Sequence, residues 1–465
     1  MKLIYDGLDY ICVTDLKITR ELNNHCSCKI TFKCDEDNIN MNTTLSLISS
    51  QFSLKYKDED NEQNIFSGFV ESVSYKKLQH YVYVTLECFT NSKQYDEEKK
   101  LNIFQETNKK IGDILKSIGY SSIHPSFFDS NDENKIIKNV IIQNDETDFQ
   151  FTKRLLNSNG IIFMCESMLM SENLWIGKRK GNCYDYNENC YEIIKNKDVE
   201  YAKITAENIF YEIGDCIKLN SKEYIIIENR ITLDNSTCIC CYLLIENYDK
   251  LSLPETEIQK TQLIGEVTET KDKDKGGKIQ IKFEADKKVS GGENYWFKQL
   301  TPYSTKDTGL FFTPAKGDKI VVDFQDGTEP LLLGTVRENK HDNFENPNEL
   351  FIKNEFGKEL NLKEKSINIV SVFDNIFLRL DEEKIEINNG KTGIYITKDN
   401  IYIQNEKGRI YLDDNILIEK KENGKIEIGE NINLKAKESK IEIADSLGID
   451  TKNKVNISAE KVIIK

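Results

Sequence analysis

The residue types that most often carry catalysis are thinly spread in this chain. His25, His80, His124 and His341 stand far apart, and none shares a motif with a nucleophile. No Gly-x-Ser-x-Gly sequence is present to hold a serine on a strained turn. Aspartates and glutamates occur throughout, but no spacing marks two of them as an acid–base pair. The sequence therefore predicts no catalytic residues, no cofactor and no enzymatic activity.

One short stretch begins like a calcium-binding loop. Asp272, Asp274 and Gly276 alternate with lysines. The stretch lacks the twelve-residue frame and the closing glutamate of such a loop. We interpret it as the first hairpin turn of a small barrel, and we predict no calcium site.

Two pairs of cysteines have the spacing of one strand face. The chain has 12 cysteines, and Cys26 with Cys28, and Cys238 with Cys240, lie two residues apart. Residues i and i+2 of a strand share a face, where cysteine behaves as a small buried hydrophobe. No secretion signal is evident, so we expect free thiols. With only four histidines, we predict no bound metal.

The charge balance argues against a nucleic-acid partner. The net charge is −15, and residues 361–465 are nearly neutral, with 18 basic and 19 acidic residues. A nucleic-acid-binding surface needs a basic face. No apolar run approaches the roughly 18 residues of a membrane span, and the first residues do not resemble a signal peptide. We therefore expect synthesis and assembly in the cytoplasm.

The most informative stretch is residues 360–465, where one short pattern recurs. Each unit has an apolar residue, any residue and a second apolar residue, followed by a polar spacer. Four successive units begin at Ile367, Ile376, Ile385 and Ile394, nine residues apart. This alternation predicts short strands with one apolar face, joined by turns of Asn, Gly and Asp. The predicted core residues are Ile367, Ile369, Ile376, Leu378, Ile385, Ile387, Ile394, Ile396, Ile401, Ile403, Ile410, Leu412, Ile426, Ile428, Ile441 and Ile443.

The length of the repeat favours three chains over one. Such short strands cannot bury an apolar face alone, so they must stack. A single-chain β-helix needs about twice this length to go once around its core. We predict an intertwined trimeric β-helix, a β-prism needle in which each chain supplies one face. The alternative is a monomeric β-solenoid with irregular turns.

The rest of the chain reads as mainly β. The strand and turn pattern predicts a first β-barrel in residues 1–100. It predicts a helical insertion and a second β-barrel in residues 101–255, and an OB-fold barrel in residues 262–340. Residues 341–359 predict a linker to the needle of residues 360–465.

Two helices are expected inside the insertion. Thr107 could cap a helix over residues 108–118, and Gly119 would end it. Residues 146–157 predict a second helix that ends before Gly160. Each has a stripe of apolar residues at helical spacing.

An ordered set of turn and core residues marks the predicted OB barrel. Gly317-Asp318 and Asp326-Gly327 bracket one strand, at turns where positive φ is needed. We interpret the set as scaffold rather than chemistry. Its members are Trp296, Gly309, Pro314, Gly317, Asp318, Phe324, Asp326, Gly327, Pro330 and Gly334.

This set and two further phrases resemble VgrG-type spike proteins of contractile injection systems, which in turn resemble phage tail hub and needle proteins. Ile103-Phe104-Gln105 is similar to a phrase that precedes the first helix in that family. Gln143 to Phe149, followed by Arg154-Leu155-Leu156 and Gly160-Ile161, is similar to the family's second signature. The resemblance covers nearly the whole chain.

The resemblance implies a structural role. It implies a homotrimeric hub and spike that contacts a hexameric inner tube and baseplate proteins, with a needle that pierces the target envelope. No histidine follows His341, so a His-x-His metal tip is not expected. The last repeats are Val455-Asn456-Ile457 and Val462-Ile463-Ile464. We expect a separate PAAR-type tip protein or an effector to dock on Ile463, Ile464 and Lys465.

A different class of function remains as the alternative. The repeats could form a carbohydrate-binding or carbohydrate-active β-solenoid. Tyr395, Tyr402 and Tyr411, at the outward middle positions of their repeats, could then stack on sugars. We favour a solvated face of the β-prism for these tyrosines, because tyrosine favours strands.

Overall fold

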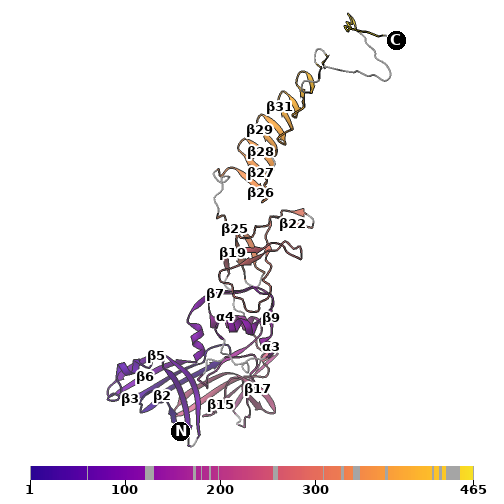
Figure 1. The fold of residues 1–465 in the computed structure, drawn as a ribbon. Helices are drawn as coiled ribbons and strands as arrows, with labels where there is room; N and C mark the ends of the chain where they lie inside the picture. Colours follow the sequence, from indigo (N-terminus) through magenta and orange to yellow (C-terminus); the bar gives the residue numbers. More distant parts are fainter. Residues whose placement is uncertain are drawn as a thin grey trace. The chain divides into compact units, whose positions relative to one another are not determined.

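We describe the chain from a computed structural model. It describes every residue except 1, 60, 121–129, 171–173, 180, 188–189, 197, 255–259, 307, 326–328, 339–345, 372–374, 421–423, 429–431, 436–450 and 464–465. The chain folds into two compact parts, Met1–Arg337 and Glu338–Lys465. As predicted, it is mainly β (Figure 1).

The first part is organised around a twelve-stranded sheet. Its main strand order is β1-β4-β5-β6-β3-β2-β17-β18-β15-β14, and β16 pairs with both β13 and β17. The strands and helix of the first half are β1 Lys2–Ile4, β2 Cys12–Glu21, β3 Ser27–Asp35, α1 Met41–Leu45, β4 Gln51–Asp58, β5 Asn61–Leu78 and β6 Tyr81–Phe89. Those of the second half are β13 Cys183–Asp185, β14 Tyr191–Asn196, β15 Val199–Glu207, β16 Cys216–Leu219, β17 Lys222–Asp234 and β18 Thr237–Ile245.

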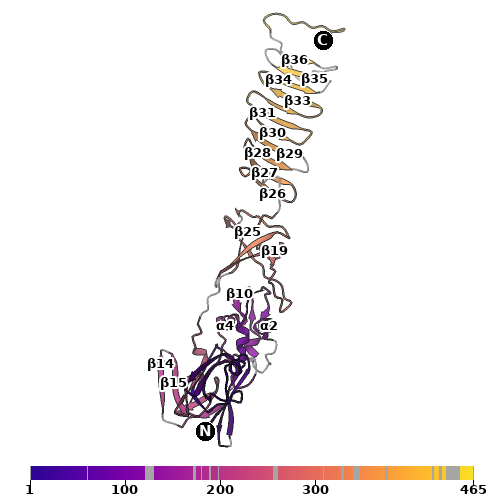
Figure 2. The ribbon, with the colours of Figure 1, turned by 90° about the vertical axis from the view of Figure 1, so that its left-hand side faces the viewer.

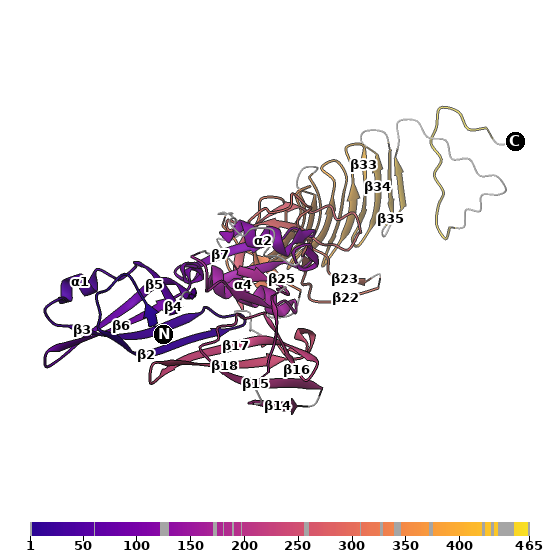
Figure 3. The same ribbon diagram turned by 90° about the horizontal axis from the view of Figure 1, so that it is seen from below.

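The two halves, predicted as separate barrels, share this sheet. Strand β2 pairs with β17 in antiparallel register, with Ile18 opposite Ile231, and the two strands run side by side in Figure 3. In β6, Val82, Val84 and Leu86 are buried while the residues between them are not, as the alternation predicts. Residues 2–253, with this sheet at their centre, are called the hub region below.

A mixed insertion interrupts the hub region. Its elements are the 3₁₀ helix η1 Asn91–Asp96, β7 Lys99–Phe104, β8 Lys109–Lys110, α2 Ile111–Ser117, α3 Ser130–Glu133, β9 Ile136–Ile137, β10 Ile141–Thr147, α4 Asp148–Ser158, β11 Phe163–Cys165 and β12 Leu174–Ile176. A second 3₁₀ helix, η4 Tyr248–Lys250, follows β18. Helix α4 begins with a capping box, in which Thr147 and Gln150 each accept a hydrogen bond from the other's backbone N–H.

The predicted cap at Thr107 is wrong. Helix α2 begins at Ile111, because Lys109 and Lys110 pair with Ile137 and Ile136 and stay extended. The backbone N–H of Thr107 instead donates to the carbonyl of Glu293. The predicted apolar stripe of this helix is nevertheless buried.

The OB barrel is built on a five-stranded sheet in the order β20-β19-β24-β25-β21. Its strands, with a small β22–β23 hairpin, are β19 Thr261–Glu269, β20 Gln280–Lys282, β21 Lys298–Gln299, β22 Ser304–Thr305, β23 Thr308–Gly309, β24 Lys319–Phe324 and β25 Leu331–Thr335. Val267, Ile281, Phe297, Val322 and Leu332 fill its core. Residues 310–312, which follow β23, are not in a strand.

The described residues of the second part form one sheet of eleven strands, each antiparallel to the next (Figure 2). Its strands are β26 Leu350–Lys353, β27 Lys358–Lys363, β28 Ser366–Ser371, β29 Ile376–Asp381, β30 Lys384–Asn388, β31 Gly393–Thr397, β32 Ile401–Gln404, β33 Gly408–Leu412, β34 Ile416–Lys420, β35 Gly424–Ile428 and β36 Ile432–Lys435. A single-chain solenoid would stack parallel strands. This strand order therefore rules out the monomeric solenoid for β26–β36.

The last predicted repeats form no strand here. The described residues 451–463 have no regular secondary structure, and Val455, Ile457, Val462 and Ile463 are exposed. A three-residue strand without a neighbour gains too few hydrogen bonds to be stable.

Candidate functional site: the hub–OB junction and the apolar sheet face

The two histidines that the structure describes, His25 and His80, lie in different surroundings. His25 lies against the ring of Phe149, with centroids 3.5 Å apart, and its Nδ1 bonds to the Ser92 hydroxyl at 2.8 Å. Burial lowers the pKa of His25 to about 4 despite Asp96 close by, so this side chain is a neutral packing residue. His80 is exposed on a turn, and His124 and His341 lie outside the described residues.

The calcium-like stretch is a hairpin turn between β19 and β20. The Asp272 carboxylate accepts hydrogen bonds from the backbone N–H groups of Asp274, Gly276 and Lys278, at 3.0, 2.9 and 3.3 Å. Its oxygens are used to hold the turn, as expected of an aspartate at this position.

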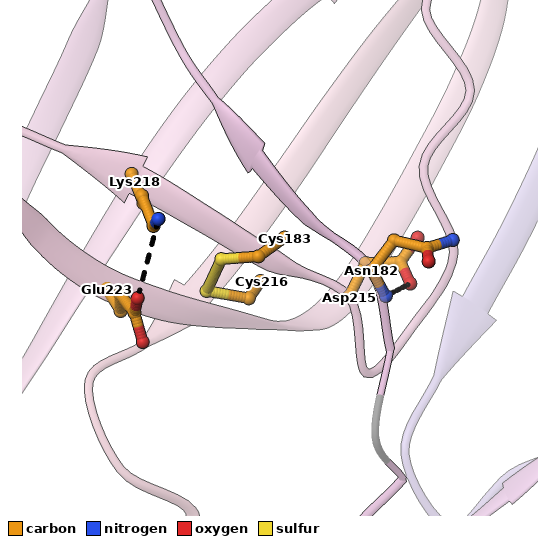
Figure 4. Close-up of a disulfide and its surroundings, with 6 residues drawn as sticks. All are labelled: Asn182, Cys183, Asp215, Cys216, Lys218 and Glu223. Carbon is orange, nitrogen blue, oxygen red and sulfur yellow. Dashed lines mark hydrogen bonds and ion pairs between the residues drawn. A yellow bond between two sulfur atoms is a disulfide. The ribbon is translucent and has the colours of Figure 1, made fainter.

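The cysteines depart from expectation at one place. Cys26, Cys28, Cys238 and Cys240 are buried free thiols. Cys183 and Cys216, however, form a disulfide (Figure 4), so the expectation of free thiols throughout is wrong. The parallel pairing of β13 with β16 places these two residues directly opposite each other.

No complete metal site is built around these sulfurs in the described part of the chain. Glu223 is the third potential ligand beside Cys183 and Cys216. With the sulfurs joined, the group offers one carboxylate, which lies 3.8 Å from the Lys218 ammonium. Cys238 and Cys241 have Cys-x-x-Cys spacing, but one is buried and the other exposed on β18.

The phrase Ile103-Phe104-Gln105 lies where the hub region meets the OB barrel. Strand β7 of the β7–β10 ribbon contains Ile103 and Phe104, and Gln105 directly follows it. Ile103 packs in the OB core with Ile142, and the next residue, Phe104, packs in the hub core, its ring stacked on Phe151 at 5.7 Å. Because neighbouring residues of a strand face opposite ways, one short strand joins the two cores.

Polar contacts reinforce this junction. Gln105 donates through Nε2 to the Ile281 carbonyl at 3.0 Å and to the Asp286 carboxylate at 2.5 Å. Glu106 Oε2 accepts from the backbone N–H groups of Val289 and Ser290, both at 2.7 Å. Burial alone would raise the pKa of Glu106, but these hydrogen bonds outweigh it and hold the pKa below its ordinary value.

A buried lysine also stabilises the chain at this junction. The Lys109 ammonium donates to the carbonyls of Glu106 and Asn139, at 2.8 and 2.6 Å. Burial lowers its pKa to about 8. All its contacts are with backbone oxygens, so Lys109 fastens the chain at residue 106 to the β9–β10 connection.

The second signature phrase is the polar support of the ribbon. Arg154 pairs with both carboxylate oxygens of Glu146, at 2.7 and 2.6 Å, and donates to the Ile142 carbonyl at 2.5 Å. Gln143 accepts from Asn102 at 2.6 Å and donates to Asp148 at 2.9 Å. These groups brace β10 against α4 and β7, so the phrase serves structure rather than catalysis.

Replacing Glu106 by alanine should weaken the junction. The N–H groups of Val289 and Ser290 would lose their charged acceptor, and a hydrogen bond to a charged group contributes about 1.5–3 kcal/mol. We expect faster proteolysis within residues 286–293 and a lower melting temperature. Glu284→Ala, an exposed change on the same barrel, is the control. If both variants behaved equally, the hydrogen bonds of Glu106 would not be needed to stabilise the junction.

The predicted needle residues line one face of the second part. Ile403 lies opposite Ile394 and Ile410, and the other column runs through Ile396, Ile401 and Leu412. The register also adds Leu380, between Ile367 and Ile385, while Ile376 lies opposite Ser371. Ile441 and Ile443 lie outside the described residues.

None of the described residues covers this apolar face. Most of its isoleucines and leucines are 36–56% exposed. On the opposite face Asn361 and Glu386 are only 8% exposed, and Tyr395 stacks on Tyr402 at 4.4 Å. A monomeric soluble protein rarely exposes a continuous apolar surface of this kind.

The OB scaffold residues lie at turns and in the core. Phe324 and Pro330 are buried, and Trp296 donates to Glu293 at 3.0 Å. Gly309 and Gly317 have φ of 149° and 91°, and Asp318 accepts from the Ala315 N–H at 2.8 Å. Pro314 and Gly334 are half-buried and exposed, and Asp326 and Gly327 lie outside the described residues.

The barrel also exposes apolar side chains that the sequence did not single out. Phe311 is 69% exposed, and Leu300, Tyr303, Leu310, Phe312 and Leu333 are exposed as well. Leu300, Phe312, Pro314 and Leu333 line one hollow of about 310 Å³.

Two family descriptions match this chain. Residues 19–192 match the phage tail baseplate hub (GPD). Residues 263–336 match the type VI secretion system/phage-baseplate injector OB domain. No curated protein sequence matches the chain.

Solved structures share the fold. The Escherichia coli c3393 protein is a component of the type VI secretion system with structural similarity to the T4 bacteriophage tail proteins gp27 and gp5. It matches with a TM-score of 0.50 and 13% identity, over 72% of this chain and 100% of that one. A chain of the Francisella PdpA–VgrG complex in its half-lidded form matches with a TM-score of 0.51 and 12% identity, over 92% of this chain and 84% of that one.

Proposed function

Because this chain is a VgrG-type hub and spike protein of contractile injection systems, we propose that three copies of it form the working spike. The observation that carries the trimer is the exposed apolar face of β26–β35. Three such faces meeting at one axis would bury two columns of isoleucine and leucine from each chain. Full burial of one such side chain contributes about 1.5–3 kcal/mol.

The exposed apolar side chains of the OB barrel support the same assembly. Phe311, Phe312 and Leu300 would be covered by a neighbouring copy around the three-fold axis. A needle of hydrogen-bonded strands around an apolar axis resists bending, which is what piercing a membrane requires.

The junction gives the spike a path for force. The two hub halves share one sheet through β2 and β17, and the β7–β10 ribbon joins that hub to the OB core. In a trimer, the two hub halves of each chain would offer six similar surfaces. This arrangement suits a hexameric inner tube as partner, with baseplate proteins around it.

A tip protein of the PAAR type, or an effector, is proposed to dock on Ile463, Ile464 and Lys465. The support is the exposure of Val462 and Ile463 beyond the last described strand. Removing residues 456–465 should abolish co-purification of the tip protein while leaving the trimer intact. Equal recovery with and without this segment would refute the docking site.

We propose that the protein acts mechanically and not as an enzyme. The families it matches are tail and baseplate families, and its polar networks brace strands and turns. No match favours the carbohydrate-active alternative. The stacked Tyr395 and Tyr402 belong to a half-buried column on the polar face of the sheet.

Assembly is proposed to take place in the cytoplasm of the producing cell, before the spike is delivered through the target envelope. Among the described helices, none combines the length and the apolar character that crossing a bilayer requires.

The function is tested in the producing cell. Deleting the gene should prevent the assembly of complete sheathed particles, as seen by electron microscopy, and the wild-type gene should restore them. Complete, contractile particles without this protein would contradict the proposal.

A further inference from the structure

The Cys183–Cys216 pair lies where a short strand joins the hub sheet. Strand β13 has three residues, and among the described strands it pairs only with β16. So short a pairing contributes little stability by itself. A cross-link between the two strands therefore helps to hold β13 in place, and the redox state of the two sulfurs sets which cross-link can form.

Backbone contacts keep the two cysteines together independently of their bond. The Cys216 N–H donates to the Asn182 carbonyl at 2.8 Å, and the Asp215 carboxylate accepts from the Asn182 N–H at 3.0 Å. Beyond the pair, the Tyr186 N–H donates to the Lys218 carbonyl at 3.2 Å. The two Cα atoms are 4.3 Å apart. Because these hydrogen bonds flank the pair on both sides, the cysteines remain neighbours after reduction of the disulfide.

The opposite face of β13 is held by packing. The ring of Tyr184 lies against that of Tyr211, with centroids 4.7 Å apart, and Tyr184 contacts the hub core. Just before β13, a Cβ at Gly181 would lie 2.4 Å from the Gly214 carbonyl oxygen, so the backbones approach closely there. Since neighbouring residues of a strand face opposite ways, Cys183 points away from this core and is exposed.

Glu223 brings a carboxylate to the two sulfurs. On β17 it lies opposite Lys218, one pair along from Ile225 opposite Cys216, and Figure 4 shows it beside the disulfide. Both sulfurs and a Glu223 carboxylate oxygen lie within 4.8 Å of one another. The only printed partner distance of this carboxylate is 3.8 Å, to the Lys218 ammonium. Both groups are exposed, so this ion pair is weak and can be exchanged for another ligand.

We propose that Cys183, Cys216 and Glu223 bind one thiophilic divalent cation, such as zinc, when the disulfide is reduced. Two thiolates and a carboxylate are ligands that zinc takes in a tetrahedral site, and water would fill the fourth position. Zinc–sulfur bonds of about 2.3 Å need the sulfurs roughly 3.8 Å apart, a spacing that neighbouring strands allow. With the disulfide intact, the sulfurs are joined and the site does not exist.

Reduction and metal binding are two separate steps. Two molecules of a thiol such as glutathione supply two electrons and two protons to the Cys183–Cys216 bond, which yields two cysteine thiols and one glutathione disulfide. The cation then displaces the two thiol protons, because the thiolate is the ligand. Cytosolic thiols are kept reduced, so there the cation would link β13 to β16 in place of the disulfide. The role proposed for the spike does not depend on this site.

Cobalt(II) serves as the spectroscopic probe of the site. The full-length protein, reduced and kept under nitrogen, should bind one cobalt ion per chain at this site with sulfur-to-cobalt charge-transfer absorption, and zinc should displace it. The oxidised protein should show no such absorption. Cys216→Ser should abolish it, and Cys241→Ser, which removes an exposed free thiol on β18, should keep it.

A change at Glu223 tests the third ligand. Glu223→Gln should weaken cobalt binding by more than the roughly tenfold that loss of an outer-shell partner costs. Glu207→Gln, an exposed change on β15, is the control and should leave the affinity unchanged. An unchanged affinity in Glu223→Gln would contradict the three-ligand site.

Alkylation of the reduced wild-type protein tests the site without any substitution. Zinc should protect Cys183 and Cys216 from iodoacetamide, as measured by mass spectrometry of the peptides. The exposed thiols of Cys12, Cys190 and Cys241 should react equally with and without zinc. Absence of the cobalt absorption in the reduced protein, its survival in Cys216→Ser, or alkylation of Cys183 that zinc does not slow would overturn the proposal.

Discussion

Replacing Ile403 by lysine is expected to destroy the needle and leave the hub folded. Ile403 lies in the middle of the apolar face, opposite Ile394 and Ile410. In the proposed trimer the change brings three ammonium groups to one level of the axis. The desolvation penalty is several kcal/mol for each ion, so the total is on the order of 10 kcal/mol.

Hydrogen exchange on the full-length protein measures this effect. Strands β31–β34 should lose their protection in Ile403→Lys, while strands β3 and β6 of the hub keep theirs. Tyr402→Lys is the matched control, because the neighbouring residue faces the other side of the same strand and should leave protection intact. Equal loss in both variants would show that the apolar face does not line a core.

Ile103→Ala and Phe104→Ala, at adjacent positions, are expected to weaken different cores. Ile103 packs in the OB core and Phe104 in the hub core. Large-to-small changes at such sites cost about 2–5 kcal/mol for isoleucine and about 3–5 kcal/mol for phenylalanine. Ile103→Ala should therefore raise exchange in β24, and Phe104→Ala should raise exchange in α4.

The control for this pair is Leu101→Ala on the same strand, whose side chain is exposed. It should change neither region. If Ile103→Ala and Phe104→Ala raised exchange equally in β24 and α4, the two cores would unfold as one unit. The role given to β7 as the link between two separate cores would then be wrong.

Local pattern explains which parts of the fold could be predicted. The alternation in β6 and in the repeats sets which side chains share a face, and a strand obeys this whatever its neighbours are. Each repeat unit has only two apolar residues, so it also required a neighbouring strand to bury them. The exposed apolar face of β26–β35 agrees with that requirement.

Contacts between distant segments could not be predicted in the same way. Cys183 and Cys216 are 33 residues apart, and only the parallel pairing of their strands brings them together. Thr107 had the right type for a helix cap, but the β8–β9 pairing keeps the chain extended beyond it.

The phrase Ile103-Phe104-Gln105 shows both what local pattern predicts and what it cannot predict. Its apolar pair was visible in the sequence, yet its use by two cores depends on which strands lie on each side of β7. The bonds of Gln105 to Ile281 and Asp286 span more than 170 positions of the chain. Such contacts follow from the assembled fold and not from spacing.

The most direct test of the spike is the mass of the intact protein in solution. One chain has a mass of 53.8 kDa, and light scattering of the full-length protein should give three times that value. The same value should persist on dilution, because an apolar axis shared by three chains does not separate readily. A stable, folded monomer would contradict the three-chain needle.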